Sequence, residues 1–331
     1  MGKSMLKLKL ETIINNTKNL AEELDDDTLI SIGNDVVEGY ETDKASREPW
    51  EKDLKSWTEL ALQISGNKTY PWPNAANIKY PLLATAAMQF AARAYPTLVP
   101  SDGKIVKCRV IGFDHDGEKT KRAERISKHM SYQVLEEMED WEEDMDKLLI
   151  CLPIAGTCFK KTYWNPNKQR NCSILVLPKT LVVNYFCTQT KRKVKELQNQ
   201  GLYLDVKLSD PSVGTEDPTK SINEAFQNTT SEDNTTPYII LEQHTYLDLD
   251  QDGYSEPYIV TVELDSHKVL RIIPRFNGDS VIVDEKSKVI SIEATQYYTK
   301  YSFIPNPDGG FYDLGFGRLL GPLNNSANTI I

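Results

Sequence analysis

The sequence predicts an α+β protein in which helices come first, strands follow, and a further helix begins near the end. Three observations support this class. Apolar residues recur at three- and four-residue steps over much of the first 150 residues, which is the period of a helix. From Thr157 the pattern changes to short runs of β-branched and aromatic residues, which are typical of strands. From Phe303 a loop rich in Pro and Gly leads into a last helical pattern. The expected regions are therefore a mainly helical one (1–150), a β-rich one (151–305), and a loop with the start of a helix (306–331).

The first region is expected to contain several helices, because its apolar residues keep a helical spacing over long stretches. Helices are expected over 3–23, over 27–64 with a break near Arg47-Glu48-Pro49, between the Pro-rich lead-in 70–73 and Pro96, and over 118–149. Asn74 and Asn77 are candidate N-caps of the third helix, and Pro96 is expected to end it. Between the third and fourth helices, residues 104–113 alternate apolar and basic side chains, which predicts a half-buried strand.

The charges of the expected helix over 118–149 are unevenly distributed. Basic residues lie in its first half, and a dense run of acids, Glu136–Asp146, lies in its second half. This polarity is unfavourable for the helix macrodipole, which favours acids at the start and bases at the end. One explanation is a ring of identical subunits, in which the basic part of one copy meets the acidic part of the next. The other is a solvated acidic face. The candidate interface residues in the run are Glu136, Glu139, Asp140 and Glu143.

The β-rich region reads as a series of short strands joined by turns. Strands are expected over 158–164, 173–177, 181–185, 238–247, 258–264, 269–276 and 294–303, with hairpins as the natural connection for the later ones. A short helix is expected over 191–200. Residues 209–236 are rich in Ser, Thr, Asp, Asn and Pro with few large apolar residues, which indicates a mobile insertion.

Composition and charge restrict the classes of function. The 331 residues carry a formal net charge of -10, which argues against a conventional DNA-binding protein but not against a conduit along which DNA must slide. The five cysteines form no C-x-x-C pair, so reduced thiols are expected. No signal peptide or apolar run long enough to span a membrane is visible, so no membrane partner is expected, and the expected location is the cytoplasm or a particle assembled there.

One stretch has the spacing of a metal-binding loop. Asp248, Asp250 and Asp252 precede a glycine in the pattern that opens an EF-hand calcium loop, and Glu256 would occupy its ninth position. The twelfth position is Ile259 rather than a bidentate Glu, and the flanks read as strands, so this is not an EF-hand. The alternatives are a weak Ca²⁺ or Mg²⁺ site on a hairpin turn and an Asp-rich turn without metal.

Signatures of catalysis are missing from the sequence. It has no P-loop, no H-E-x-x-H, no G-x-S-x-G and no dinucleotide fingerprint, and its four histidines show no ligand spacing. We therefore expect no enzyme, no catalytic residue and no organic cofactor. Two rival classes stay open, a calcium-stabilised interaction module and a cytoplasmic enzyme without a recognisable motif.

Three long segments of the chain resemble one family. They are WPNAA-x-IKYP (72–81), LDLD-x-DGY-x-EPYIVT (247–261) and FIPNPDGGFYDLGFG-x-LLGPLN (303–324). In this order they resemble the portal protein, or head-tail connector, of tailed bacteriophages, in the large type of podoviruses and myoviruses. The sequence ends inside the last expected helix, whereas large portals continue further. The resemblance therefore covers the N-terminal, wing-like part of a portal, and a fragment or one half of a split portal is the expectation.

The resemblance implies a structural virion protein that assembles in the host cytoplasm. Such portals form a homo-oligomeric ring, usually a dodecamer, at one capsid vertex, through which double-stranded DNA passes without sequence-specific binding during packaging and ejection. The expected partners are other copies of the chain, the terminase motor, the major capsid and scaffold proteins, and tail adaptor proteins. For Arg318, which follows the glycines of the third segment, the resemblance suggests a contact to a neighbouring subunit, and a structural arginine at a helix start is the alternative.

Overall fold

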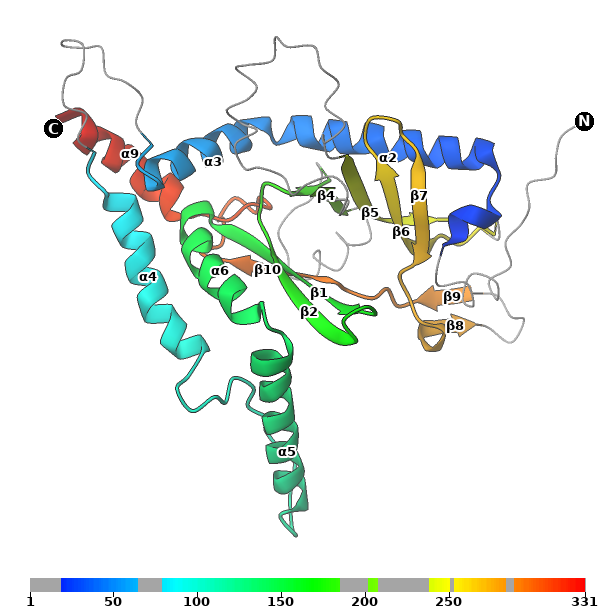
Figure 1. The fold of residues 1–331 in the computed structure, drawn as a ribbon, viewed down its shortest axis with the longest axis horizontal. Coiled ribbons are helices and arrows are strands. Elements are labelled where there is room, and N and C mark those ends of the chain that lie inside the picture. Colours follow the sequence, from blue (N-terminus) through cyan, green and yellow to red (C-terminus); the bar gives the residue numbers. More distant parts are fainter. Residues whose placement is uncertain are drawn as a thin grey trace, which may run out of the picture. The chain divides into compact units, whose positions relative to one another are not determined.

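A computed structural model describes residues 19–64, 79–184, 202–207, 238–250, 253–283 and 289–330, with only the backbone of 202–207 (Figure 1). It confirms the α+β class: the described residues form six α-helices and several antiparallel sheets, with helices before strands and a helix at the end. None of the described helices combines the length and the apolar character that crossing a membrane requires.

The helices in chain order are α2 (Asp26–Ser46), α3 (Glu48–Ala61), α4 (Leu82–Leu98), α5 (Glu118–Tyr132), α6 (Trp141–Ala155) and α9 (Phe316–Ile330). The short turns are η1 (Leu20–Glu23), the π-helical turn η2 (Gln133–Glu137) and η3 (Gly278–Ser280). The strands are β1 (Thr157–Asn165), β2 (Arg170–Val176), β3 (Leu181–Val183), β4 (Leu202–Lys207), β5 (Ile239–Leu247), β6 (Glu256–Glu263), β7 (Val269–Pro274), β8 (Val281–Val283), β9 (Val289–Ile292) and β10 (Tyr298–Ser302).

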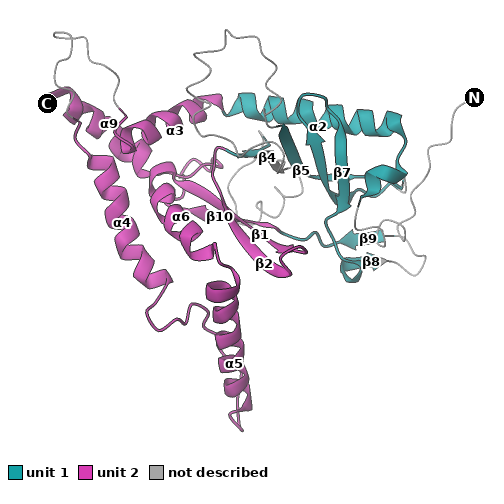
Figure 2. Ribbon diagram, in the orientation of Figure 1, with its two compact units in different colours: residues 1–47, 180–296 teal, residues 48–179, 297–331 magenta. Residues whose placement is uncertain are grey.

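Contacts in space group these elements into two compact units that are each discontinuous in sequence (Figure 2). Unit 1 contains residues 1–47 and 180–296, and unit 2 contains residues 48–179 and 297–331. The first helix thus belongs with the strands of the middle of the chain, and the remaining helices belong with β1, β2 and β10. This grouping differs from the order of helical and β-rich regions along the sequence.

Unit 1 is a five-stranded antiparallel sheet of order β3-β4-β5-β6-β7 with α2 packed on it and the hairpin β8-β9 beside it. The expected hairpins β5-β6 and β6-β7 are present, and Leu241 pairs with Val262 in the first of them. The core is built from α2 residues such as Val36, Val37 and Tyr40 and from inward-facing strand residues. Gly33 lets α2 approach the turn after β6, because a Cβ there would lie 2.1 Å from the His267 carbonyl oxygen.

Unit 2 is built around the three-stranded sheet β10-β1-β2. Successive residues of a strand point to opposite faces. On the Cys158 face, α6 contributes Met145, Leu148 and Leu152 to a buried cluster. On the opposite face, Phe159 stacks against Phe311 of the loop after β10, with ring centroids 5.9 Å apart.

The loop over 303–315, which is the most distinctive sequence segment, is held by buried polar contacts. Asp313 has no exposed side-chain surface, and its carboxylate lies 2.9 Å from the Lys300 ammonium. The same side chain accepts a 3.2 Å hydrogen bond from the Asn306 backbone N–H, and the Asp313 N–H donates to the Thr157 hydroxyl at 2.8 Å. Burial lowers the pKa of Lys300, and the hydrogen bond to Asp313 partly opposes this. This network fixes the loop against β1 and so sets the start of α9.

The N-terminus of α4 is capped from a distant segment. The side-chain oxygen of Asn324, which is buried on α9, accepts a 3.1 Å hydrogen bond from the Leu83 N–H, and that of Asn328 accepts from the Tyr80 N–H at 2.7 Å. The candidate caps at positions 74 and 77 lie outside the described residues. The sequence offered no signal for a cap that comes from 241 residues away.

The expectation that Pro96 ends α4 is wrong. Pro96 lies inside the helix, which continues to Leu98, and the Val99 N–H still donates to the Tyr95 carbonyl at 2.8 Å. A proline this close to the C-terminus removes one intrahelical donor but leaves the donors that follow it in place.

The single helix expected over 118–149 is divided. The structure has α5, the turn η2, and after a break at 138–140 a second helix, α6, that extends to Ala155. This division resolves the acidic half of the pattern, because Glu142, Glu143 and Asp144 now lie in the first turn of a new helix, where acids are favoured; Lys119 and Lys121 still lie in the first turn of α5. The position of these acids therefore gives no reason to expect a ring.

The strand expected over 104–113 is absent from the described sheets. These residues run extended beside α5, and half-buried Val106, Cys108 and Val110 alternate with exposed Lys107 and Arg109. The alternation of half-buried and exposed residues is present, but the element that covers the half-buried side is a helix rather than a strand. Of the helix expected over 3–23, only the end is described, and it forms the 3-10 turn η1 rather than an α-helix. The helix expected over 191–200 and the insertion 209–236 lie outside the described residues.

Candidate subunit interface

We call residues 101–132 the arm; it consists of an extended lead-in (101–117) and helix α5. The lead-in is held to the helix by the Val106 backbone, whose N–H donates to Ser131 Oγ at 3.2 Å and whose carbonyl accepts from Ser127 Oγ. Asp114 accepts hydrogen bonds from the N–H groups of Lys119 and Thr120, at 3.3 and 2.9 Å, and so caps the first turn of α5. The arm is thus a defined local structure.

The arm has little support from the rest of unit 2. In α5 the only buried residue is Ser131, which faces the lead-in. Apart from the lead-in and the turn η2, no described element packs closely against α5, which extends away from the sheet of unit 2 in Figure 1. A helix of 15 residues is marginally stable in water without packing. The arm is therefore expected to gain stability from a partner.

Large apolar side chains are exposed along this arm. Ile111 is 93% exposed and Phe113 is 85% exposed, and Ile126, Met130 and Tyr132 are exposed on α5. Burying one such side chain fully is worth about 1.5–3 kcal/mol. Neighbouring exposed residues of this size on one short segment are typical of an interaction surface.

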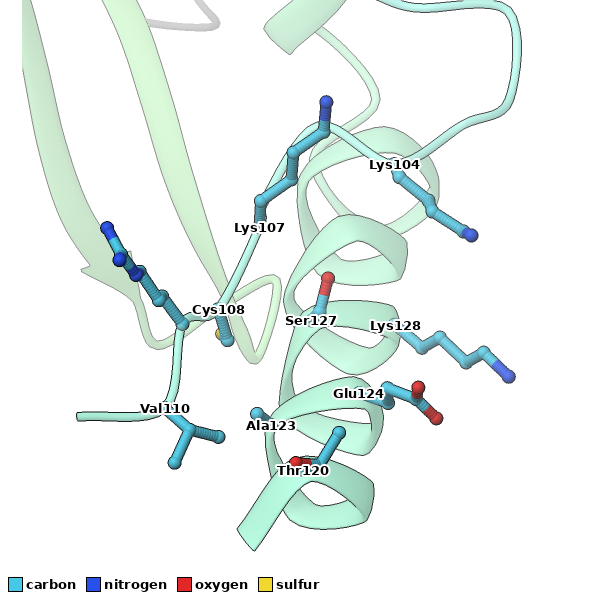
Figure 3. A pocket seen from close by; sticks show the side chains of 10 residues that line it. Lys104, Lys107, Cys108, Val110, Thr120, Ala123, Glu124, Ser127 and Lys128 are labelled. Atoms are coloured by element: carbon cyan, nitrogen blue, oxygen red, sulfur yellow. The ribbon is translucent and has the colours of Figure 1, made fainter. Parts of the chain in front are cut away.

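Cations surround a groove between the lead-in and α5 (Figure 3). Its volume is about 570 Å³, and it is lined by Lys104, Lys107, Cys108, Arg109, Val110, Thr120, Ala123, Glu124, Ser127 and Lys128. The ammonium groups of Lys104, Lys107 and Lys128 point outward rather than toward a common point (Figure 3). The hydroxyls of Ser127 and Thr120 already donate to Val106 O and Asp114 Oδ2. The groove therefore lacks converging cations that would bind a small anion, and its charged groups face solvent.

We call residues Glu136–Asp146 the acidic elbow; they run from the end of η2, which follows the arm, into the first turns of α6. Two of the four candidate interface acids have partners within the chain: Glu139 lies 2.8 Å from Arg170, and Glu143 lies 2.7 Å from Lys147. The hydrogen bond from Arg170 lowers the pKa of Glu139, and that from Lys147 lowers the pKa of Glu143.

The other acids of the elbow also fall into two groups, those with a hydrogen-bond partner within the chain and those that form no ion pair with a described residue. Glu142 accepts from the Tyr95 hydroxyl, and Asp144 accepts from the Leu175 N–H at 2.6 Å. The remaining candidates, Glu136 and Asp140, are exposed and form no ion pair with any described residue, and the same holds for Asp146. Three acids of the elbow are thus available to a partner.

Arg318 lies on the exposed side of α9, and it forms no ion pair within the described part of the chain. The buried residues of this helix are Gly317, Gly321 and Asn324. A Cβ on Gly317 would lie 2.6 Å from the Trp57 ring, so α9 approaches α3 closely on the side away from solvent. Arg318 therefore plays no part in this packing and stays an interface candidate.

The candidate metal ligands form no metal site among the residues that the structure describes. Asp248 accepts a 3.1 Å hydrogen bond from the Gly253 N–H. Glu256 is buried at the start of β6 and accepts from the Tyr258 hydroxyl at 3.3 Å; burial and then Glu256 raise the pKa of Tyr258. Asp252 lies outside the described residues, and among those described no group of three or more His, Cys, Asp or Glu is placed to hold a metal ion.

Neither a comparison with models of known protein families nor a search of curated proteins finds a match to this chain. Among the described residues, the arm and its neighbouring elbow combine exposed apolar side chains with charges that form no ion pair. The sequence located the acids of the elbow. It did not show that Ile111 and Phe113 are exposed, because large apolar residues at the end of an expected half-buried strand are expected to be covered.

Proposed function

We propose that this chain is a structural subunit of a portal ring, the homo-oligomer at a capsid vertex through which DNA is packaged and ejected. The proposal combines the resemblance of the three sequence segments with one observation of the structure. This observation is the arm, a folded helix and lead-in that carries exposed apolar and charged residues and has almost no packing partner among the described residues of its own chain.

A structural subunit explains this arrangement better than a monomeric protein does. An isolated short helix and exposed Ile and Phe side chains cost stability and solubility in a monomer, but in an oligomer a neighbouring copy covers them. Rings arise when one surface of a subunit binds a different surface of the next and the rotation closes. In this proposal the terminase motor, capsid and scaffold proteins and tail adaptors bind the assembled ring, and no catalytic group of this chain takes part.

Electron microscopy of the purified chain tests the proposal. We expect ring-shaped particles with a central opening wide enough for duplex DNA. A chain that forms only compact monomers or open, non-closing fibres contradicts it. Hydrogen exchange provides a second readout: peptides over 104–132 should become protected when the protein is concentrated from a dilute to an assembled state, and peptides over α2 should not.

A further inference from the structure

We infer that the basic face of the arm binds the acidic elbow of a second copy of this chain, so that copies associate head to tail. The inference rests on the proposed function, because it names the surfaces through which the proposed ring would form. It commits to a second copy as the partner of the arm.

The arm carries a set of cations that the described part of the chain does not neutralise. They are exposed and form no ion pair with a described residue: Lys104, Lys107, Arg109, Lys121, Arg122, Arg125 and Lys128. Lys121, Arg125 and Lys128 follow each other at four- and three-residue steps, so they lie on one face of α5. In a chain of net charge -10, such a cluster is a local exception that needs its own explanation.

The acids within one turn of the basic face, Glu118 and Glu124, form no ion pair with a described residue. The elbow of the same copy begins at Glu136, which lies eight positions after Lys128 and 15 after Lys121, so the helical rise places it about 12 Å and about 22 Å further along the axis. Both separations exceed the roughly 8 Å over which salt screens exposed charges at physiological ionic strength. Within one copy, the basic face and the elbow therefore hardly interact, and an ion pair between them needs two copies.

The elbow has the complementary chemistry. Its three unpaired acids, Glu136, Asp140 and Asp146, are as exposed as the cations of the arm. Because the two surfaces differ and lie on the same molecule, their pairing is heterologous and propagates from copy to copy. The exposed Ile111 and Phe113, which follow the groove residue Val110 in the chain, would add apolar contact to this charge pairing. A nucleic acid would fit the cations but would be repelled by the elbow and by the net charge of the chain.

A charge-swap experiment tests this pairing on the full chain. The arm variant is Lys121→Glu/Arg125→Glu/Lys128→Glu, and the elbow variant is Glu136→Lys/Asp140→Lys/Asp146→Lys. A control variant, Lys55→Glu/Arg93→Glu/Lys268→Glu, makes the same change in net charge as the arm variant, at exposed residues away from the arm. Circular dichroism of each variant checks that the fold is kept, and light scattering measures the particle mass.

We expect each swapped variant to lose at least tenfold in self-association at moderate salt, while the control variant assembles as the wild type does. In a 1:1 mixture, the acidic arm of one variant meets the basic elbow of the other, so the mixture should assemble again. Recovery on mixing is a result that general damage to the fold cannot produce.

Three results would overturn the inference, and they can be told apart. If the wild type and the arm variant assemble equally well, the pairing is wrong but the proposed function stands. If the arm variant loses binding to DNA fragments while its self-association is unchanged, the basic face serves a nucleic acid. If the wild type stays monomeric at every concentration, the proposed function fails, and the inference fails with it.

Discussion

Replacing Asp313 by Asn tests whether the buried pair with Lys300 holds the 303–315 loop in place. Asn preserves the shape of the side chain and an acceptor for the Asn306 N–H, but it leaves the Lys300 ammonium without its counter-charge at 2.9 Å. Removing one partner of a buried ion pair costs about 3–5 kcal/mol. Lys300 keeps 11% of its side-chain surface exposed and also donates to the Phe311 carbonyl, so we expect the lower end, about 3 kcal/mol.

The loss should depend on pH in a defined direction. Burial lowers the pKa of Lys300 in the folded state, and Asp313 partly opposes this. In the Asp313→Asn variant the opposing contribution is gone, so the pKa falls further below its value in the unfolded chain. The folded state then binds fewer protons than the unfolded state, and stability rises with pH between the two pKa values. We therefore expect the difference from the wild type to shrink as the pH is raised from neutral toward the unfolded-state value.

Urea unfolding at neutral and at mildly alkaline pH measures both effects, and hydrogen exchange locates them in the peptides around Thr157 and Phe311. The control is Lys300→Met/Asp313→Asn, which removes the uncompensated charge and keeps the acceptor for Asn306. This double variant should recover most of the lost stability. A loss below about 1 kcal/mol in the single variant, or a double variant as unstable as the single one, would refute the reasoning.

Three further predictions concern packing, charge and capping in unit 2, each measured by urea unfolding. Gly317→Ala should destabilise the protein by about 1–3 kcal/mol, because its Cβ would lie 2.6 Å from the Trp57 ring. Gly321→Ala, whose Cβ would have its nearest contact at 3.5 Å, should be neutral or stabilising. Equal effects of the two substitutions would contradict this reasoning. Lys160 is 2% exposed and its ammonium has no hydrogen bond in the described structure, so burial lowers its pKa. The free energy of unfolding of the wild type should therefore rise at alkaline pH. The Lys160→Met variant should show a smaller rise and should be at least as stable as the wild type at pH 7. Asn324→Ala should cost about 0.5–2 kcal/mol through the lost cap of α4, and exchange of the first α4 amides should speed up; unchanged exchange would count against the cap.

Most elements could be predicted from the sequence because their signals are local. The break between α2 and α3, the strands β1, β2, β5, β6 and β7, and the last helix all follow from side-chain periodicity and from turn residues. The position of β1 immediately after Gly156 also follows from local chemistry, since this glycine has φ of 85° and ends α6.

What the sequence could not predict depends on contacts between distant residues. The cap that Asn324 provides to α4 joins two segments 241 residues apart. The pairing of β1 with β10 brings Cys158 beside Tyr301, and no local pattern specifies it. The break at 138–140 was missed because the apolar spacing runs through it, while the division of charge, which was interpreted as strain in one helix, marks the start of the second helix.

The candidate interface was predicted in part. The acids of the elbow stand out in the sequence because they are dense, and the pair of Glu143 with Lys147 has the local i,i+4 spacing of a helix. The pair of Glu139 with Arg170 joins residues 31 positions apart, which the sequence could not show. The exposure of Phe113 could not be predicted, because a large apolar side chain at the end of an expected strand is normally covered, and the structure places this segment beside a helix that covers only one side of it. Periodicity reports that one side of a segment is covered, but it does not report what covers it.

The mass of the purified chain in solution tests the central claim, that this is a self-assembling ring subunit, most directly. Light scattering over a range of protein concentrations and native mass spectrometry should find one defined multiple of 37.6 kDa that persists on dilution. A closed ring has a fixed number of copies, so a single oligomeric species is the predicted result. A monomer of 37.6 kDa at every concentration would contradict the account.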